Sequence, residues 1–144
     1  MSPSTTLSRD TWAVMSDQNV EVVRRMYEAR DSGDAAGALA QFHPEVVVDA
    51  TARGDAGIGQ GREELAAIIA EWIGEFNEWR EEVEEMRDLG DSVCVVATQR
   101  GRGYKSGVEV EARYALLFEV RDDKITRMTM FRGLSEALEA AGPQ

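Results

Sequence analysis

The segments after residue 90 constrain the fold most, because they are strand-like and are joined by turns too short to hold a helix. Residues 91–101, "DSVCVVATQRG", are rich in valine and threonine, as strands are. Residues 108–120 begin with strict alternation and become largely apolar, which is typical of a central strand. Residues 125–131 alternate again after the short "RDDK" turn. Strands joined this closely pair antiparallel, so the sequence predicts an antiparallel sheet here.

Two amphipathic segments earlier in the chain predict helices. Residues 19–30 place valine, methionine and tyrosine at steps of three and four, with Ser16 or Asp17 as the cap. Residues 62–79 carry seven large apolar side chains at steps of one and three, which is the strongest helical pattern in the chain. Helices followed by a run of strands indicate an α+β fold with an antiparallel sheet.

Shorter elements connect these segments. Asp34 is expected to cap a short second helix, which Pro44 prevents from continuing. Residues 45–49 follow as a short strand, and the glycines of 51–61 indicate a loop. The pattern of 80–88 fits either an extension of the long helix or an acidic, exposed strand.

The composition bounds the class of protein. The chain has 144 residues, which predicts one domain at 17–144, preceded by a flexible extension at 1–16 that lacks periodicity. A net charge of -11 argues against nucleic-acid binding, and no apolar run approaches the ~18 residues of a membrane span. Without a secretory signal, and with Cys94 as the single cysteine, a cytoplasmic location is expected.

The stretch "FHPEVVVDA" at 42–50 is the first that suggests chemistry. A run of valines ends in Asp49, and an ionised carboxylate is rarely buried without a partner. Asp49 is therefore a candidate general base, although a strand followed by its turn explains the same letters. The single histidine, His43, is interpreted as a helix-end residue before the proline.

Other patterns exclude cofactors and metals. "GIGQG" lacks the third glycine of a dinucleotide-binding fingerprint, because Arg62 stands at that position. One histidine and one cysteine far apart in the sequence give no metal-ligand spacing. Cys94 alternates with valines in a predicted strand and is interpreted as a buried, inert thiol. We expect neither a metal nor a cofactor.

Aromatic and basic side chains add further candidates. Trp72 and Trp79 share the apolar face of the predicted long helix, where they pack in the core or form the wall of a pocket. Arg113 lies on a strand face that turns apolar further along. A buried arginine needs a carboxylate, for which Asp49 and the glutamates of the same strand are candidates, while an exposed cross-strand ladder is the alternative.

The order of these segments over residues 17–142 resembles the SnoaL-like branch of the nuclear transport factor 2-like superfamily. The resemblance rests on "GD" after the first helix, "HPEV" before the first strand and the "DKI" hairpin. It implies a cone-shaped fold, in which a curved antiparallel sheet wraps around the helices and encloses a pocket. It also implies that 80–88 is a strand and that the protein is a homodimer. Members include polyketide cyclases, ketosteroid isomerases, limonene epoxide hydrolases and scytalone dehydratases.

The resemblance does not carry the isomerase residues over. The position of the isomerase base falls on Ala50, that of its tyrosine on Met26 and that of its second aspartate on Ala115. Asp49 and Tyr27 are each one residue away, and a slip of one residue on a strand turns a side chain to the opposite face. Steroid isomerisation is therefore not predicted.

Two functions remain open. In the first, the protein is an enzyme of the isomerase, cyclase or hydrolase type that acts on a small apolar or polyketide-like molecule. Asp49 would then move a proton, Tyr27 would donate a hydrogen bond, and Arg113 would hold an anionic oxygen. In the second, it is a non-catalytic small-molecule binder or a dimeric scaffold. The expected ligand-binding residues are Met26, Trp72, Phe76, Trp79, Ala115, Leu117, Met128 and Met130.

Overall fold

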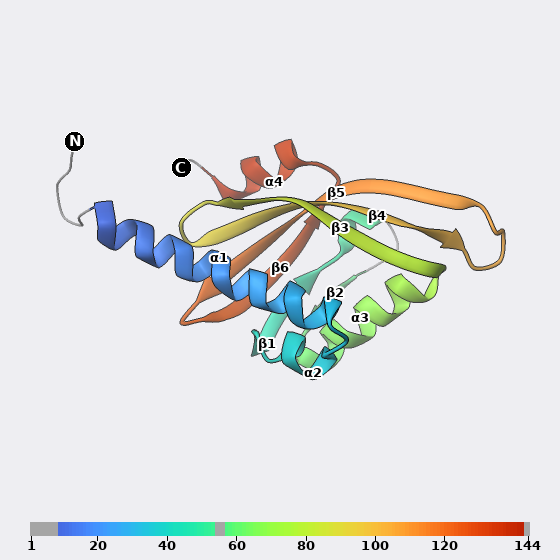
Figure 1. Ribbon diagram of the computed structural model, residues 1–144, viewed down its shortest axis with the longest axis horizontal. Helices are drawn as coiled ribbons and strands as arrows, with labels where there is room; N and C mark the ends of the chain where they lie inside the picture. The colour runs from blue at the N-terminus through green and yellow to red at the C-terminus, as the bar shows by residue number, and fades with distance from the viewer. Residues whose placement is uncertain (1–8, 54–56, 143–144) are drawn as a thin grey trace.

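The computed structural model describes residues 9–53 and 57–142 (Figure 1). The helices lie mainly in the first half of the chain and four consecutive strands follow them, which confirms the α+β class. The elements are α1 Arg9–Asp31, α2 Ala35–Leu39, β1 Phe42–Asp49, a 3-10 turn at Thr51–Arg53, β2 Ile58–Gln60, α3 Arg62–Gly74, β3 Phe76–Asp88, β4 Ser92–Gly103, β5 Glu109–Arg121, β6 Lys124–Phe131 and α4 Leu134–Ala141.

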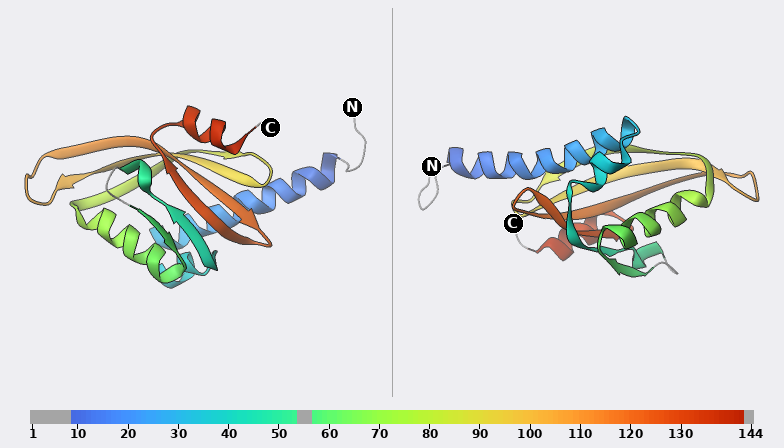
Figure 2. Two further views of the ribbon diagram at one scale, coloured as in Figure 1. Left: turned by 180° about the vertical axis from the view of Figure 1, so that it is seen from behind. Right: turned by 90° about the horizontal axis from the view of Figure 1, so that it is seen from below.

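One curved sheet of six strands organises the molecule, in the order β2-β1-β6-β5-β4-β3. All neighbouring strands are antiparallel except β1 and β6, which are parallel. The helices α1, α2 and α3 lie on one side of this sheet and α4 on the other, as the two turned views show (Figure 2). The predicted curved sheet around N-terminal helices is therefore confirmed, with one parallel pair that the sequence pattern did not indicate.

The alternation of β4 and β5 separates two apolar layers. Val95 of β4 and Phe118 of β5 belong to the main core beneath α1 and α3. Their neighbours Cys94 and Leu117 point to the opposite face, where they pack with Ala137 of α4. Because successive strand side chains face opposite ways, β5 is apolar on both faces, as its sequence suggests.

The structure corrects the predicted start of the first helix. The helix α1 begins at Arg9, well before the predicted cap at Ser16 or Asp17. Residues 9–16 of the predicted flexible extension are thus helical, whereas the prediction for residues 1–8 lies outside the described residues. At the other end Gly33 adopts a φ of 83°, a conformation that favours glycine, and so ends the helix where predicted.

The long helix is shorter than its apolar pattern predicts. The helix α3 ends at Gly74, so Phe76 and Trp79 belong to β3. The register of β3 shifts after Asn77, and Glu78 has a φ of 56°, which marks a bulge. A bulge adds one residue, so side chains three apart face the same side and imitate helical spacing.

The ambiguous acidic stretch at 80–88 is a strand, as the family resemblance implied. The predicted loop at 51–61 holds the 3-10 turn and the short strand β2. Asp34 caps α2 by accepting a hydrogen bond from the backbone N–H of Gly37 at 2.8 Å, as expected. Among the described residues, no helix is both long and apolar enough to cross a membrane.

Candidate functional site

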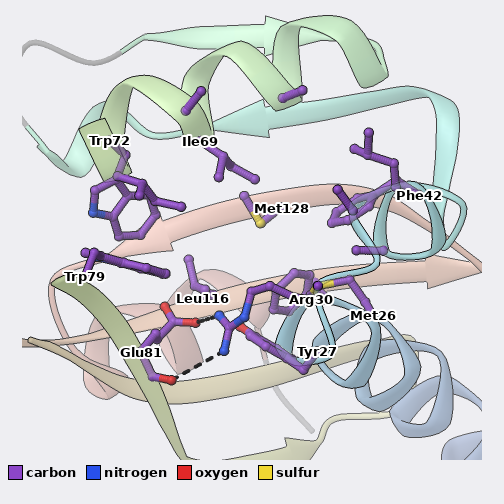
Figure 3. Close-up of a pocket in the computed structure, with 18 residues that line it drawn as sticks. Met26, Tyr27, Arg30, Phe42, Ile69, Trp72, Trp79, Glu81, Leu116 and Met128 are labelled. Atoms are coloured by element: carbon purple, nitrogen blue, oxygen red, sulfur yellow. Dashed lines mark hydrogen bonds and ion pairs between the residues drawn. The ribbon is translucent and has the colours of Figure 1, made fainter. Parts of the chain in front are cut away.

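A cavity of about 420 Å³ lies between the helices and the concave side of the sheet. That volume is within the ~300–1,000 Å³ of ordinary small-molecule sites. Trp72 and Trp79 lie at one end and Phe42 at the other, with Met128 between them (Figure 3). Most of the wall is apolar, so the few polar groups that reach it decide what the cavity can do.

Glu81 of β3 is the buried carboxylate of this cavity, with a side chain only 4% exposed. Its Oε1 accepts a hydrogen bond from Nη1 of Arg30 at 2.6 Å, and Arg30 Nη2 also reaches the Glu81 carbonyl oxygen at 3.3 Å. The hydroxyl of Tyr114 donates to Oε2. The carboxylate is therefore held by a hydroxyl from β5 and by a cation from α1. Figure 3 shows the contacts between Glu81 and Arg30.

Arg30 remains charged in this setting. Burial alone lowers the pKa of Arg30, but the charge of Glu81 and hydrogen bonds to Glu81 and Asp31 raise that pKa above its ordinary value. The guanidinium carbon lies 4.8 Å from the ring centre of Tyr27 and 5.8 Å from that of Trp79. The aromatic faces thus stabilise the same cation that holds Glu81.

Two tyrosines beside the ion pair are kept neutral. Burial raises the pKa of Tyr27 well above its ordinary value, and the charge of Glu81 raises it further. Burial and the Glu81 charge raise the pKa of Tyr114 in the same way. Both hydroxyls are therefore hydrogen-bond donors near neutral pH. The Tyr27 hydroxyl is the buried side-chain group that has no hydrogen-bond partner within the described part of the chain.

The aromatic end of the cavity is fixed by one buried amide. Trp72 and Trp79 both donate their indole N–H to Oε1 of Gln99, at 2.8 and 3.0 Å. The two ring centres lie 6.3 Å apart at an angle of 71°, an edge-to-face contact. Trp72 also meets Tyr114 edge to face at 5.3 Å. This end of the wall is therefore built from connected, oriented rings.

The structure brings five of the predicted site residues to this cavity: Met26, Tyr27, Trp72, Trp79 and Met128. Four other predicted ligand-binding residues do not line it. Phe76 and Met130 pack against the main core. Ala115 and Leu117 point to the other face of the sheet, toward α4, because their neighbours Leu116 and Phe118 take the cavity side.

Asp49 is not among the cavity residues. Val46 and Val48 face the core, so Asp49 alternates away from it at the end of β1. Its Oδ1 accepts hydrogen bonds from the N–H and hydroxyl of Thr51, at 3.1 and 2.6 Å, and its Oδ2 lies 3.5 Å from Nη2 of Arg127. The Thr51 hydroxyl is the main cause of a lowered pKa for Asp49, so this carboxylate stays ionised.

Arg113 also lies away from the cavity. Its side chain is 65% exposed, and its Nε contacts Oε1 of Glu84 at 2.9 Å. The partner is therefore Glu84, and not Asp49 or the glutamates of the same strand, in the exposed arrangement that was the alternative. His43 has a local role, since its Nδ1 accepts a hydrogen bond from the N–H of Glu45 at 3.0 Å.

Arg30 and Glu81 are the polar cavity residues that sequence reasoning missed. Arg30 lies three and four residues after Tyr27 and Met26, on the same helix face. Glu81 alternates with Trp79 and precedes Val83 by two positions, which places it inward once the segment is taken as a strand. Their positions could thus have been predicted from these spacings. Glu81, however, lies in a run of acidic residues, and such residues are ordinarily exposed.

Within residues 9–53 and 57–142, no group of three or more histidine, cysteine, aspartate and glutamate side chains is arranged to hold a metal ion. The curved sheet and its helices enclose a largely apolar cavity, and the Arg30–Glu81 pair lies in the wall of that cavity. The chain belongs to the SnoaL-like domain family, whose sequence profile matches residues 23–128. No curated protein sequence matches it.

Solved structures share this fold at low sequence identity. A proposed SnoaL-like polyketide cyclase from Jannaschia is 22% identical, covers 98% of this chain and 100% of its own, and has a TM-score of 0.72. An NTF2-like protein of unknown function from Burkholderia pseudomallei is 20% identical, with 88% and 98% covered and a TM-score of 0.70. A protein with a ketosteroid isomerase-like fold from Catenulispora acidiphila, in complex with trimethylamine, is 19% identical, with 86% and 94% covered and a TM-score of 0.66.

Proposed function

We propose that this protein binds a small, largely apolar molecule in its cavity and catalyses a proton transfer on it, with Glu81 as the acid-base group. The observation that carries this proposal is the position of the Glu81 carboxylate, 4% exposed, in the wall of a largely apolar cavity. A carboxylate in such a place is costly, and acid-base catalysis is a common reason for retaining one.

The neighbouring groups supply complementary roles. The molecule would bind with a carbonyl oxygen near the guanidinium of Arg30, which lines the cavity next to the ring of Tyr27. Glu81 would take a proton from the carbon beside the carbonyl, and the electron pair of that C–H bond would move to the carbonyl oxygen. Arg30 stabilises the enolate oxygen that forms. Return of the proton to the same or another carbon completes an exchange or an isomerisation.

Arg30 sets a condition on this chemistry. Its contact with Oε1 at 2.6 Å occupies one of the two oxygens that could take the proton. A substrate oxygen that draws the guanidinium toward itself would release Glu81 when charge develops. Arg30 would then have two roles. It would hold Glu81 before the reaction and stabilise the enolate oxygen once the proton has been removed.

Deuterium exchange tests the proposal without knowledge of the natural substrate. α-Tetralone and related flat bicyclic ketones are incubated with the protein in heavy water, and incorporation beside the carbonyl is followed by mass spectrometry. Glu81→Gln should lower the exchange rate by about 100-fold or more, the usual contribution of a general base. Glu82→Gln is the matched control, because Glu82 is the next residue of β3 and its side chain is 61% exposed. Equal rates in wild type and Glu81→Gln would contradict the proposal.

A non-catalytic binding function is the second candidate. It is favoured by the satisfaction of Glu81, whose two carboxylate oxygens already accept hydrogen bonds from Arg30 and Tyr114. The cavity would then act as a receptor for a neutral apolar molecule. Nile red, a neutral fluorescent dye, reports binding in either case. Binding of Nile red without exchange on any ketone of the series would support this second function over the first.

A further inference from the structure

Gln99 lies behind the cavity wall and contacts both tryptophans that form the aromatic end. It is only 8% exposed, and it is not one of the cavity-lining residues. Gln99 is on the same face of β4 as Val95 and Ala97, which point into the main core. In the sheet register it lies directly opposite Glu81 of β3. Its amide therefore occupies a buried position between the acid-base group and the aromatic wall.

A single oxygen of Gln99 satisfies two donors. An amide oxygen has two lone pairs, and here they accept the indole N–H of Trp72 at 2.8 Å and that of Trp79 at 3.0 Å. An indole N–H can only donate, and when buried it needs an acceptor. For these two rings the acceptor is the same atom, so the orientation of one ring is tied to that of the other.

The two rings come from different elements. Trp72 is near the end of α3, and Trp79 lies on β3 just beyond the bulge at Glu78. Nothing in the chain geometry between them fixes the angle of one ring to the other, because a helix end, a turn and a bulge intervene. The common acceptor on β4 supplies such a constraint, and the two rings meet edge to face at an angle of 71°.

We propose that Gln99 is a positioning residue that sets the shape of the aromatic wall and thereby selects which apolar molecules fit the cavity. It acts through Trp72 and Trp79 and does not itself touch the bound molecule. This inference rests on the proposed function in one respect, namely that a small molecule binds in this cavity. It does not depend on whether that molecule undergoes a reaction.

Two neutral probes of different shape test the inference. Nile red is a broad fused-ring molecule, and diphenylhexatriene is a narrow rod. Gln99→Met keeps the length of the side chain and removes the acceptor, so the ratio of the two dissociation constants should change by roughly two- to tenfold, the range of one hydrogen bond. Val95→Ala is the matched control, because it removes apolar volume from the same strand face without removing the acceptor of either indole, and Val95 does not line the cavity. It should leave the ratio unchanged.

A second measurement follows the wall without any ligand. The chain has three tryptophans, and in Gln99→Met two of the three indole N–H signals in the NMR spectrum should move upfield as their hydrogen bonds are lost. If Gln99→Met does not fold, Gln99→Asn serves instead, because its side chain is one methylene shorter and moves the amide away from the two indoles. The probe ratio and the indole signals are then compared in the same way. A wild-type ratio, or unshifted indole signals, would overturn the role of Gln99 alone. Failure of the wild-type protein to bind either probe would overturn the proposed function and this inference together.

Discussion

Two buried tyrosines near the cavity differ in whether their hydroxyls have a hydrogen-bond partner. Tyr27 and Tyr114 are both almost fully buried, and both flank Glu81. The Tyr114 hydroxyl donates to Glu81, while the Tyr27 hydroxyl has no partner in the described part of the chain. A buried hydroxyl without a partner has lost its hydrogen bonds to water with nothing in return, so the Tyr27 hydroxyl should cost stability.

Tyr27→Phe should therefore leave the free energy of unfolding unchanged or raise it by up to about 1 kcal/mol, because it removes an unsatisfied polar atom. Tyr114→Phe is the control and should lower that free energy by about 2 kcal/mol, because a hydrogen bond to a charged group is lost. Urea unfolding of both variants makes the comparison. A larger loss for Tyr27→Phe than for Tyr114→Phe would show that the Tyr27 hydroxyl has a partner in solution.

Asp49 gives a prediction that depends on pH. Its pKa is lowered from 3.8, first by the Thr51 hydroxyl, so its stabilising effect is present above that value and is lost as pH falls through the lowered folded-state pKa. Asp49→Ala should lower the free energy of unfolding by about 1 kcal/mol at neutral pH. The difference from wild type should shrink below pH 3.8. Denaturant unfolding at neutral and acidic pH measures this.

The same variant tests the earlier expectation that Asp49 is a base. Since Asp49 faces away from the cavity, Asp49→Ala should leave deuterium exchange on α-tetralone unchanged, in contrast to Glu81→Gln. Loss of exchange in Asp49→Ala, at a protein concentration where it is fully folded, would return the catalytic role to Asp49.

At the scale of elements, local patterns predicted most strands and helices. They failed where one apolar pattern, that of residues 62–79, runs from α3 into β3. The strand patterns of 108–120 and 125–131 gave β5 and β6 correctly to within one residue at each end. The spacing of Phe76 and Trp79 fitted a helix, because a bulge reproduces a step of three. The parallel pairing of β1 with β6 depends on partners far apart in sequence, about which local alternation says nothing.

The β5–β6 hairpin carries local strain that a substitution should relieve. Asp122 and Asp123 have φ values of 52° and 63°, the left-handed conformation of a two-residue type I′ turn, for which glycine is preferred at the second position. Asp123→Gly should raise the free energy of unfolding by about 0.5–1 kcal/mol. Asp123→Ala should lower it, because alanine gains no freedom there and loses the tolerance of aspartate for this conformation. Thermal unfolding of the two variants measures the difference. A higher stability for Asp123→Ala than for Asp123→Gly would contradict the prediction.

At the scale of the whole molecule, the sequence predicted the fold class and the aromatic part of the cavity but not its charged centre. Trp72, Trp79 and Met128 were expected because large apolar side chains on inward faces line whatever space the fold leaves. Arg30 and Glu81 are separated by 51 positions and meet only when α1 crosses beneath β3. Their pairing is a property of the assembled layers, and either residue alone looks like an exposed charge in the sequence.

The pair joins the helical layer to the edge of the sheet, so its removal should be asymmetric. All variants of the pair are compared in a Tyr114→Phe background, because Glu81 is also the acceptor of the buried Tyr114 hydroxyl. Arg30→Met leaves Glu81, 4% exposed, without its cation, and should lower the free energy of unfolding by about 3 kcal/mol. Glu81→Met should cost less, because the Arg30 side chain is 27% exposed and retains Asp31 as a partner at 2.9 Å.

The double variant Arg30→Met/Glu81→Met separates the attraction of the pair from the cost of burying it. Replacement of both charges by apolar side chains should recover most of the loss seen in Arg30→Met, since a buried ion pair contributes little net stability over a packed apolar pair. Unfolding free energies of the four proteins form a double-mutant cycle. If the double variant were the least stable of the four, the pair would be a structural requirement of the fold. Recovery of stability together with loss of deuterium exchange would instead indicate that the charges are kept for the chemistry of the cavity.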